Sequence, residues 1–329
     1  MSPDTGPRGG APVARATRPI VALMPAQLQH EWDLYHATWF TLMGIGGGIF
    51  LLARLLRVER RLGVWLGLPV VDLVSFVVIG VGGLVLVWSL GRPFRMLRAV
   101  LKPGTSWISR GAIADFIFLV LGALLILPGL TLGRATPFAA LPWDPWATTT
   151  IGMAIEIVSL AAAAIVIVYA GLVLSDKAAI TFWRSPLIPA QFVLSSLAMS
   201  MSTIMVMEAL AHAPIDRIQC LLLMKVCLLL ALTIVWHLVT DRARPGKAES
   251  LRRLATTYRW LFFAGVLGAG TLLPMLLALV GVVSPTDRGA LGIVCLLLTV
   301  AGGFFLRLVT LRVGYFPPVS GALRLSKRG

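Results

Sequence analysis

Eight long runs of apolar residues divide the chain, and each is bounded by charged residues or by clusters of proline and glycine. A bilayer core of about 30 Å requires about 20 apolar residues in a helix that rises about 1.5 Å per residue. The runs are continuous and do not alternate with polar residues, which favours helices over the strands of a barrel. The pattern predicts an all-α, polytopic membrane bundle of eight transmembrane helices, at residues 36–56, 69–90, 111–131, 149–174, 186–210, 217–239, 259–281 and 289–311.

The composition supports this pattern, since 58% of the 329 residues are hydrophobic and only 13% are charged. Such values are atypical of a soluble domain and exclude intrinsic disorder, and three cysteines are too few for a disulfide scaffold. We expect one transmembrane domain at 36–312, flanked by basic, flexible tails at 1–35 and 313–329. The N-terminal tail lacks the apolar segment of a cleaved signal peptide.

The formal charge of +15 is unevenly distributed over the loops. An even number of spans places both tails on one side, named side X, together with the loops after the second, fourth and sixth spans; the other loops lie on side Y. Side X carries 20 of the 29 Lys and Arg residues and side Y carries seven. The positive-inside rule therefore predicts a protein of the cytoplasmic (inner) membrane with both termini in the cytoplasm, and it removes the need for a nucleic-acid partner. A basic surface that docks a partner on the outer face is the alternative explanation.

Ionisable groups are costly at membrane depth, so each is a functional candidate. A water-filled proton path is predicted in the half of the bundle near side Y, from Asp72, Glu156, Glu208 and Lys225. A ligand site is predicted in the half near side X, where the polar candidates are His36, Asp115, Tyr169, His237 and Arg307. The competing interpretation of the first group is structural: Lys225 pairs with Glu156 or Glu208, while Asp72 and Glu208 lie in headgroup water.

Motifs for metals and nucleotides are missing from the sequence. The four histidines do not supply the paired ligands of two b haems, although His36 and His237 could face each other. Cys220, Cys227 and Cys295 lack metal-ligand spacing and are expected to be buried thiols. We expect no metal, haem or iron–sulfur cluster in this chain and no catalytic residue of its own.

Two segments on side X are unusually specific for membrane loops. The first, SLGRPFRMLRAVLKPGTSWISRGA, runs from Ser89 to Ala112 and combines four arginines with Trp107. The second, YAGLVLSDKAAITFWRSPLIP, runs from Tyr169 to Pro189. It places a tyrosine near the end of the fourth span, followed by interfacial basic and aromatic residues.

Together with GIGGGIFLLARLL in the first span and GGFFLRLV in the last, these segments resemble the NrfD-like family. This family comprises membrane subunits of polysulfide, sulfite, dimethyl sulfoxide and related molybdenum iron–sulfur oxidoreductases. The resemblance covers residues from about 33 to 313. It implies an eight-span, haem-free anchor in membrane lipid that binds menaquinone or ubiquinone. It also implies electron exchange with a docked four-cluster ferredoxin-like subunit, itself joined to a molybdopterin catalytic subunit. Proton translocation is a further expectation.

The resemblance also implies roles for individual residues. Tyr169 matches a family tyrosine that hydrogen-bonds a quinone carbonyl, and His36 or Trp39 falls near a second polar position of the family. Arg110 would orient the docking loop or the quinone. Asp115 and Lys177 are weaker quinone-site candidates. The expected docking residues are Arg92, Arg95, Arg98, Trp107 and Arg184.

Two other functional classes stay open. A secondary transporter with a midplane substrate site would need broken helices in two corresponding halves of the chain, to which Pro128 and Pro274 give faint support. The other class is a purely structural anchor without a redox role.

Overall fold

A computed structural model describes residues 20–89, 102–177, 179–284 and 288–322. Within them the prediction of an all-α membrane bundle is confirmed, because eight helices are long and apolar enough to cross a bilayer. Their bounds differ by only a few residues from those expected. They are α1 Leu34–Leu55, α2 Val70–Ser89, α4 Trp107–Ile126 with the 3-10 turn η2 Leu127–Gly129, α5 Thr150–Ser175, α6 Leu187–Leu210, α7 Arg217–Val239, η3 Trp260–Leu272 continued by α9 Leu273–Val283, and α10 Arg288–Arg312.

Side-chain caps define the starts of several helices. Asp33 caps α1, and its carboxylate accepts the backbone N–H groups of Tyr35 and His36. The start of α4 lies before the predicted residue 111 because Ser106 caps it, accepting the N–H of Ser109 at 3.4 Å. Such oxygen acceptors satisfy N–H groups that have no partner within the helix.

The seventh span departs from the regular α-helix that its hydropathy predicts. Its first part, η3, is a π-helix, and the Thr271 hydroxyl donates to the Val266 carbonyl at 2.8 Å. Gly270 of η3 faces Gly302 of α10 so closely that a Cβ on Gly270 would lie 2.4 Å from the Gly302 Cα. The small residues therefore let these two backbones touch, as expected for the glycine pairs in the spans.

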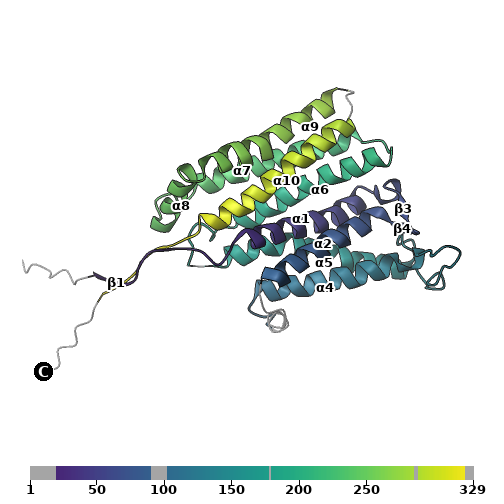
Figure 1. Cartoon of the computed structure of the whole chain (residues 1–329), viewed down its shortest axis with the longest axis horizontal. Helices are drawn as coiled ribbons and strands as arrows, with labels where there is room; N and C mark the ends of the chain where they lie inside the picture. Colours follow the sequence, from purple (N-terminus) through teal and green to yellow (C-terminus); the bar gives the residue numbers. More distant parts are fainter. Residues whose placement is uncertain (1–19, 90–101, 178, 285–287, 323–329) are drawn as a thin grey trace, which may run out of the picture.

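The spans form two groups of four, seen in the lower and upper halves of Figure 1. The first group contains α1, α2, α4 and α5; the second contains α6, α7, η3 with α9, and α10. Helix α1 also packs against α6 and α10 and so joins the groups. It is the most enclosed of the eight spans, since 72% of an 18-residue apolar stretch of α1 is buried.

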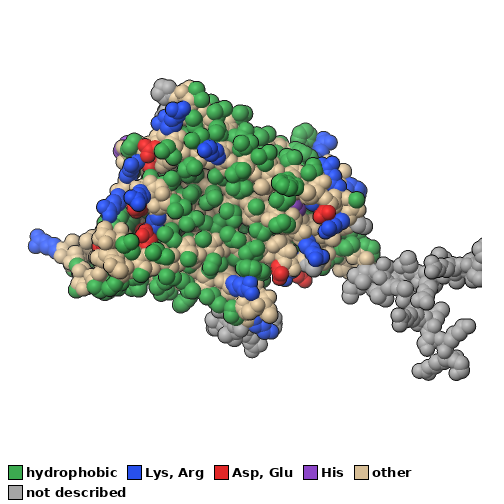
Figure 2. All heavy atoms as spheres, turned by 180° about the vertical axis from the view of Figure 1, so that it is seen from behind, with side chains coloured by type: hydrophobic (Ala, Val, Ile, Leu, Met, Phe, Trp, Pro, Cys, Tyr) green, Lys and Arg blue, Asp and Glu red, His purple; other side chains and the backbone are tan. Residues whose placement is uncertain are grey.

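The face of the bundle drawn in Figure 2 is mostly apolar between two ends where charged side chains gather. Large hydrophobic side chains such as Trp88, Phe116 and Leu297 are 68–80% exposed. A surface of this kind is stable in lipid but not in water. The chain is therefore a multi-pass membrane protein.

Side X holds two features that the hydrophobic pattern did not predict. The loop after α7 contains the surface helix α8, Pro245–Ala255. The described parts of the tails pair as antiparallel strands, at the left of Figure 1: β1 Ile20–Met24 with β6 Val319–Ala322, and β2 Gln27–Leu28 with β5 Tyr315–Phe316. The expectation of flexible tails is therefore wrong for these segments, because backbone hydrogen bonds between them replace those to water.

On side Y, the described loops between the spans contain only short elements. The 3-10 turn η1 covers Glu59–Arg61, and the hairpin strands β3 Val64–Trp65 and β4 Leu68–Pro69 follow it. Gly67 makes this turn with a φ of 78°.

Candidate functional site

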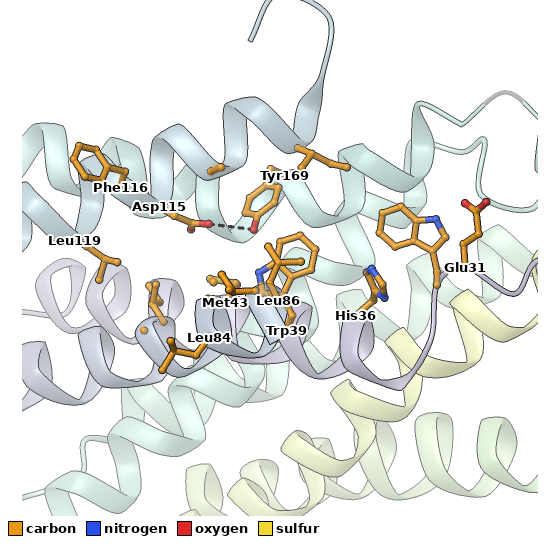
Figure 3. Close-up of a pocket in the computed structure, with 17 residues that line it drawn as sticks. Glu31, His36, Trp39, Met43, Leu84, Leu86, Asp115, Phe116, Leu119 and Tyr169 are labelled. Carbon is orange, nitrogen blue, oxygen red and sulfur yellow. Dashed lines mark hydrogen bonds between the residues drawn. The ribbon is translucent and has the colours of Figure 1, made fainter. Parts of the chain in front are cut away.

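A pocket of about 520 Å³ opens within the first helix group, and we name it the lateral pocket (Figure 3). Its walls come from α1, α2, α4, α5 and the segment before α1. Leu84 of α2 and Phe116 of α4 both line it and are 70% and 69% exposed, so the pocket reaches the lipid-facing surface between these helices. The lining residues are Glu31, Trp32, His36, Trp39, Met43, Ile79, Gly80, Gly83, Leu84, Leu86, Val87, Ile108, Ala112, Asp115, Phe116, Leu119 and Tyr169.

Two glycines of α2 keep this opening wide. A Cβ on Gly80 would meet no atom within 4 Å, and one on Gly83 would meet only the Met43 Cε at 4.0 Å. Larger side chains at these positions would therefore extend into free space without a backbone clash. The pocket is apolar over most of its wall, as ligand pockets usually are, with few polar groups.

The inner end of the lateral pocket is formed by Asp115 and Tyr169. The Tyr169 hydroxyl donates to Asp115 Oδ2 at 3.2 Å, and the Tyr169 side chain is almost fully buried. Asp115 Oδ1 is also buried, but it has no hydrogen-bond partner among the described residues. A buried polar atom without a partner is costly, so its presence at a pocket wall indicates a place for a ligand or water.

The position of Tyr169 depends on Gly111 of α4. A Cβ on Gly111 would lie 2.3 Å from the Tyr169 Cδ2 atom and within 2.6 Å of two more ring atoms. Gly111 ends the SWISRG motif, and its missing side chain is what lets the tyrosine ring pack against α4.

An aromatic row continues from Tyr169 toward side X. The Trp39 ring lies 5.9 Å from the Tyr169 ring, and the His36 ring lies 6.4 Å from Trp39, as measured between ring centroids. The Trp39 indole N–H is buried and makes no hydrogen bond of good geometry with a described residue. Three predicted quinone-site residues, together with Asp115, therefore lie along one pocket.

His36 lies at the end of the lateral pocket nearest side X, which we name the mouth, and Asp33 holds it there. Its Nδ1 lies 3.0 Å from Asp33 Oδ1, with the two side chains 20% and 41% exposed. Partial burial opposes ionisation of Asp33, but the hydrogen bonds and charge of His36 outweigh it and lower the Asp33 pKa. Asp33 is therefore a stable carboxylate next to a titratable ring.

The other two predicted quinone-site residues lie elsewhere. Arg110 donates to the carbonyls of Pro103 and Gly104 at 2.8 and 2.9 Å and stacks on Trp107, so it organises the start of α4. This geometry agrees with its expected role in orienting the loop, but not with contact to a ligand in the pocket. Lys177 is exposed and lines a separate hollow, the X-face cleft, which shares Glu31 and Trp32 with the lateral pocket.

The match to known families covers nearly the whole chain: residues 24–318 fit the family described as polysulphide reductase, NrfD. The chain belongs to the NrfD family. Chains of this family are membrane subunits of molybdoenzyme and iron–sulfur complexes. No curated protein matches the sequence.

The predicted Y-side residues of this NrfD-family chain separate into two structural clusters. In the first, Arg54 binds both carboxylate oxygens of Asp72, with NH2 at 2.9 Å from Oδ2, and its Nε lies 2.9 Å from Glu156 Oε1. The Asp72 side chain is fully buried, so it does not lie in headgroup water. Arg54 is one of the seven basic residues counted for side Y, but it lies within α1 and is the partner that both carboxylates use.

In the second cluster, Glu208 is fully buried and accepts a hydrogen bond from Gln219 at 2.7 Å. Lys225 is exposed and makes no ion pair with a described residue. The predicted pairing of Lys225 with Glu156 or Glu208 is therefore wrong, and so is the placement of Glu208 in headgroup water. The structure does not join the four expected proton-path residues into one connected chain.

The remaining polar candidates of the X half lie outside the lateral pocket. Arg307 is buried between α10 and α6, where it donates to Ser195, Ser196 and the carbonyls of Phe192 and Gly303. His237 lies under α8 against Phe182, so it does not face His36. The three cysteines are free and buried, as expected.

The expected docking residues are only partly described. Arg92, Arg95 and Arg98 lie outside the described residues. Trp107 and Arg184 are placed on side X by the starts of α4 and α6, and Arg184 is exposed.

Asp33, Glu31 and Arg54 are not among the candidate site residues named from the sequence. For Asp33 a signal was available, namely an Asp three residues before a His at the start of a helix.

Proposed function

We propose that this chain is the quinone-reactive subunit of its complex, exchanging electrons between the membrane quinone pool and an iron–sulfur subunit docked on side X. The observation that carries the proposal is the lateral pocket. It is open to lipid between α2 and α4, and it ends at Asp115 Oδ1, a buried carboxylate oxygen for which the described residues supply no hydrogen-bond partner.

The residues present fit a quinone. A quinone has a flat ring with an oxygen at each end and a long apolar tail, and it dissolves in the bilayer. The glycine-lined opening at Gly80 and Gly83 suits entry from lipid and leaves room for the tail. Trp39 offers an aromatic face, while Asp115 with Tyr169 and His36 provide polar groups at the two ends of the row.

The polar groups also suit the chemistry. Oxidation of a quinol releases two electrons and two protons, and reduction of a quinone takes up the same. The Tyr169 hydroxyl can donate a hydrogen bond to a carbonyl oxygen, and Asp115 and His36 can accept or return protons. Menaquinone and ubiquinone both meet these requirements.

The depth of the pocket supports docking on side X. Asp115 lies eight residues from the start of α4 and Tyr169 six residues from the end of α5. At 1.5 Å per residue these positions are about 12 and 9 Å from the helix ends. A soluble four-cluster ferredoxin-like subunit, itself joined to a molybdopterin subunit, would approach the pocket most closely from this side.

We further propose that side X faces the cytoplasm, with the chain in the cytoplasmic membrane. The excess of basic residues on side X supports this orientation. Arg54 is buried within α1 and so is no longer one of the seven basic residues counted for side Y. Its removal from that count increases the excess of basic residues on side X over side Y. Labelling of a cysteine introduced at Arg184 by an impermeant reagent in intact cells would contradict this orientation.

The transporter alternative has less support. It requires broken helices in corresponding halves of the chain, and the described spans depart from regular α-helix at η2 and η3, which belong to the third span of each group of four. Neither segment lines a pocket large enough for a substrate at the midplane, since the space beside Thr271 admits no water molecule.

The experiment that tests the proposal narrows the lipid-facing opening. Gly80→Leu and Gly83→Leu are introduced separately into the complete complex, which is purified in mild detergent. We expect the quinone that co-purifies, measured by chromatography, to fall toward background, and quinol-linked turnover to fall with it.

The matched control is Val81→Leu, which adds similar bulk to the exposed outer face of the same helix. It should leave quinone content and turnover unchanged. If the wild-type complex contains no quinone and shows no quinol-linked turnover, the proposed function is wrong. Normal quinone content in both glycine variants would show that the lateral pocket is not the site.

A further inference from the structure

The polar groups of the lateral pocket form a row that leads only toward side X. Figure 3 shows Asp115 and Tyr169 at one end, Trp39 and His36 along the row, and Glu31 at the other end. Glu31 lines both the lateral pocket and the X-face cleft, so the row ends where one opening meets the other.

Three phenylalanine rings lie beyond Asp115 in the direction of side Y, outside the lining of the pocket. Phe118 lies one turn beyond Asp115 on α4, and its ring is 4.9 Å from Phe50 and 5.4 Å from Phe76. Phe50 and Phe118 are fully buried. The Arg54 guanidinium lies over the other side of Phe50, at 3.9 Å from the ring centroid. An apolar layer therefore separates Asp115 from the carboxylates of the Arg54 cluster.

That cluster is also occupied by its own interactions. Arg54 holds Asp72 and Glu156, and Glu208 lies in the second helix group, bonded to Gln219. Protons from the pocket would have to cross an aromatic layer to reach them, and phenylalanine side chains provide no groups for a hydrogen-bonded relay.

We propose that the pocket exchanges its protons with side X through His36, positioned by Asp33. This inference rests on the proposed quinone function and goes beyond it, because it makes turnover electroneutral: electrons and protons leave on the same side. It replaces a route through the Y-side carboxylates.

The proton balance for quinol oxidation is as follows. Two electrons pass to the iron–sulfur subunit, and two protons stay in the pocket. The proton of the quinol hydroxyl nearest His36 passes to His36 Nε2, which has no hydrogen-bond partner among the described residues. The Asp33 carboxylate stabilises the resulting imidazolium, which then gives its proton to water at the mouth. The second proton passes to Asp115 Oδ1, which has no hydrogen-bond partner among the described residues. After the product leaves, Asp115 gives this proton to water that enters the pocket from side X.

Other charged groups near His36 are few in the described chain. Glu31 lies beside His36 in the lining of the pocket, and Asp115 and Tyr169 lie further along it. His30, Asp176 and Lys177 line the X-face cleft beyond Trp32. The wall contributed by α2 is apolar. Asp33 is thus the group that contacts the ring directly.

The test uses Asp33→Asn in the complete complex. Asparagine caps a helix as well as aspartate does, so α1 should keep its start while the charge beside His36 is lost. We expect quinol oxidation to slow on the order of tenfold or more. We also expect the acidic limb of its pH profile to move to lower pH, because the imidazolium has lost its stabilising carboxylate.

Asp216→Asn is a matched control, because Asp216 is also a helix-capping aspartate, but at the start of α7 on side Y. It should change neither the rate nor the pH profile. An Asp33→Asn profile identical to that of wild type would overturn the assignment of Asp33 and His36, even with bound quinone present.

A second experiment measures on which side of the membrane the protons appear and whether turnover generates a membrane potential. The wild-type complex in proteoliposomes oxidises quinol with ferricyanide, an acceptor of electrons without protons, supplied on side X. We expect two protons per quinol to appear on side X and a voltage-sensitive dye to give no signal, while a potassium gradient with valinomycin shows that the dye responds. Protons on side Y, or a turnover-dependent potential, would refute the route. Absence of quinol-linked turnover would refute the proposed function instead.

Discussion

Arg54 should be among the most important single residues for the stability of the first helix group. Its side chain is 5% exposed and that of Asp72 is 0% exposed, so neither charge is hydrated. Replacing Arg54 with Met keeps much of the side-chain volume but leaves the Asp72 carboxylate buried without a counter-charge. Removing one partner of a buried ion pair costs about 3–5 kcal/mol.

The three partners should not be equivalent. Glu156 is 26% exposed and can gain water when Arg54 is lost, whereas Asp72 cannot. Arg54→Met should therefore destabilise most, Asp72→Asn less, and Glu156→Gln least. The double variant Arg54→Met with Asp72→Asn should be more stable than Arg54→Met alone, because it contains no buried, unpaired charge.

The free energy of unfolding can be measured by titrating the protein with SDS in mixed micelles and following helix content. The exposed pair of Arg61 and Asp216, at 3.0 Å, provides the control: Arg61→Met should cost about 0–1 kcal/mol. An Arg54→Met cost within about 1 kcal/mol of that control, or a double variant no more stable than the single one, would show that this ion pair does not stabilise the fold.

Three further outcomes are expected. Tyr169→Phe leaves both Asp115 oxygens without a partner, so quinol-linked turnover should fall while the complex still assembles, as gel filtration would show; His36→Ala should act in the same way. Gly111→Ala should displace the Tyr169 ring and lower turnover with a destabilisation of about 1–3 kcal/mol, measurable in the same SDS titration. Arg307→Lys should lose the two bonds made by NH2 and destabilise by about 3 kcal/mol, and Arg307→Met should be less harmful because it buries no charge.

Hydropathy predicts the architecture well because the bilayer imposes one physical requirement on every span. The eight ranges and the assignment of the loops to two sides follow from it. It does not predict α8, whose eleven residues are too short and too basic to resemble a span. It also gives no sign that Arg54, which lies at the side Y end of the predicted span 36–56 and is counted with the basic residues of that side, binds two carboxylates.

The candidate site was predicted residue by residue but not as an arrangement. Tyr169, Asp115, His36 and Trp39 could each be named from residue type and depth. Their meeting in one pocket depends on how α1, α4 and α5 pack, which a single sequence does not specify. The role of Gly111 also emerges only from the contact with the Tyr169 ring.

The paired ends of the chain also bear on how it is made. Gln29 donates to the Leu311 carbonyl, a partner 282 positions further along the sequence, and β1 pairs with β6, whose residues are more distant still. During synthesis these early segments are left without their partners until all eight helices have been inserted. Pairing of these strands therefore follows synthesis of the last span, and a chain that stops before β6 would leave an unpaired strand edge that can associate with other chains.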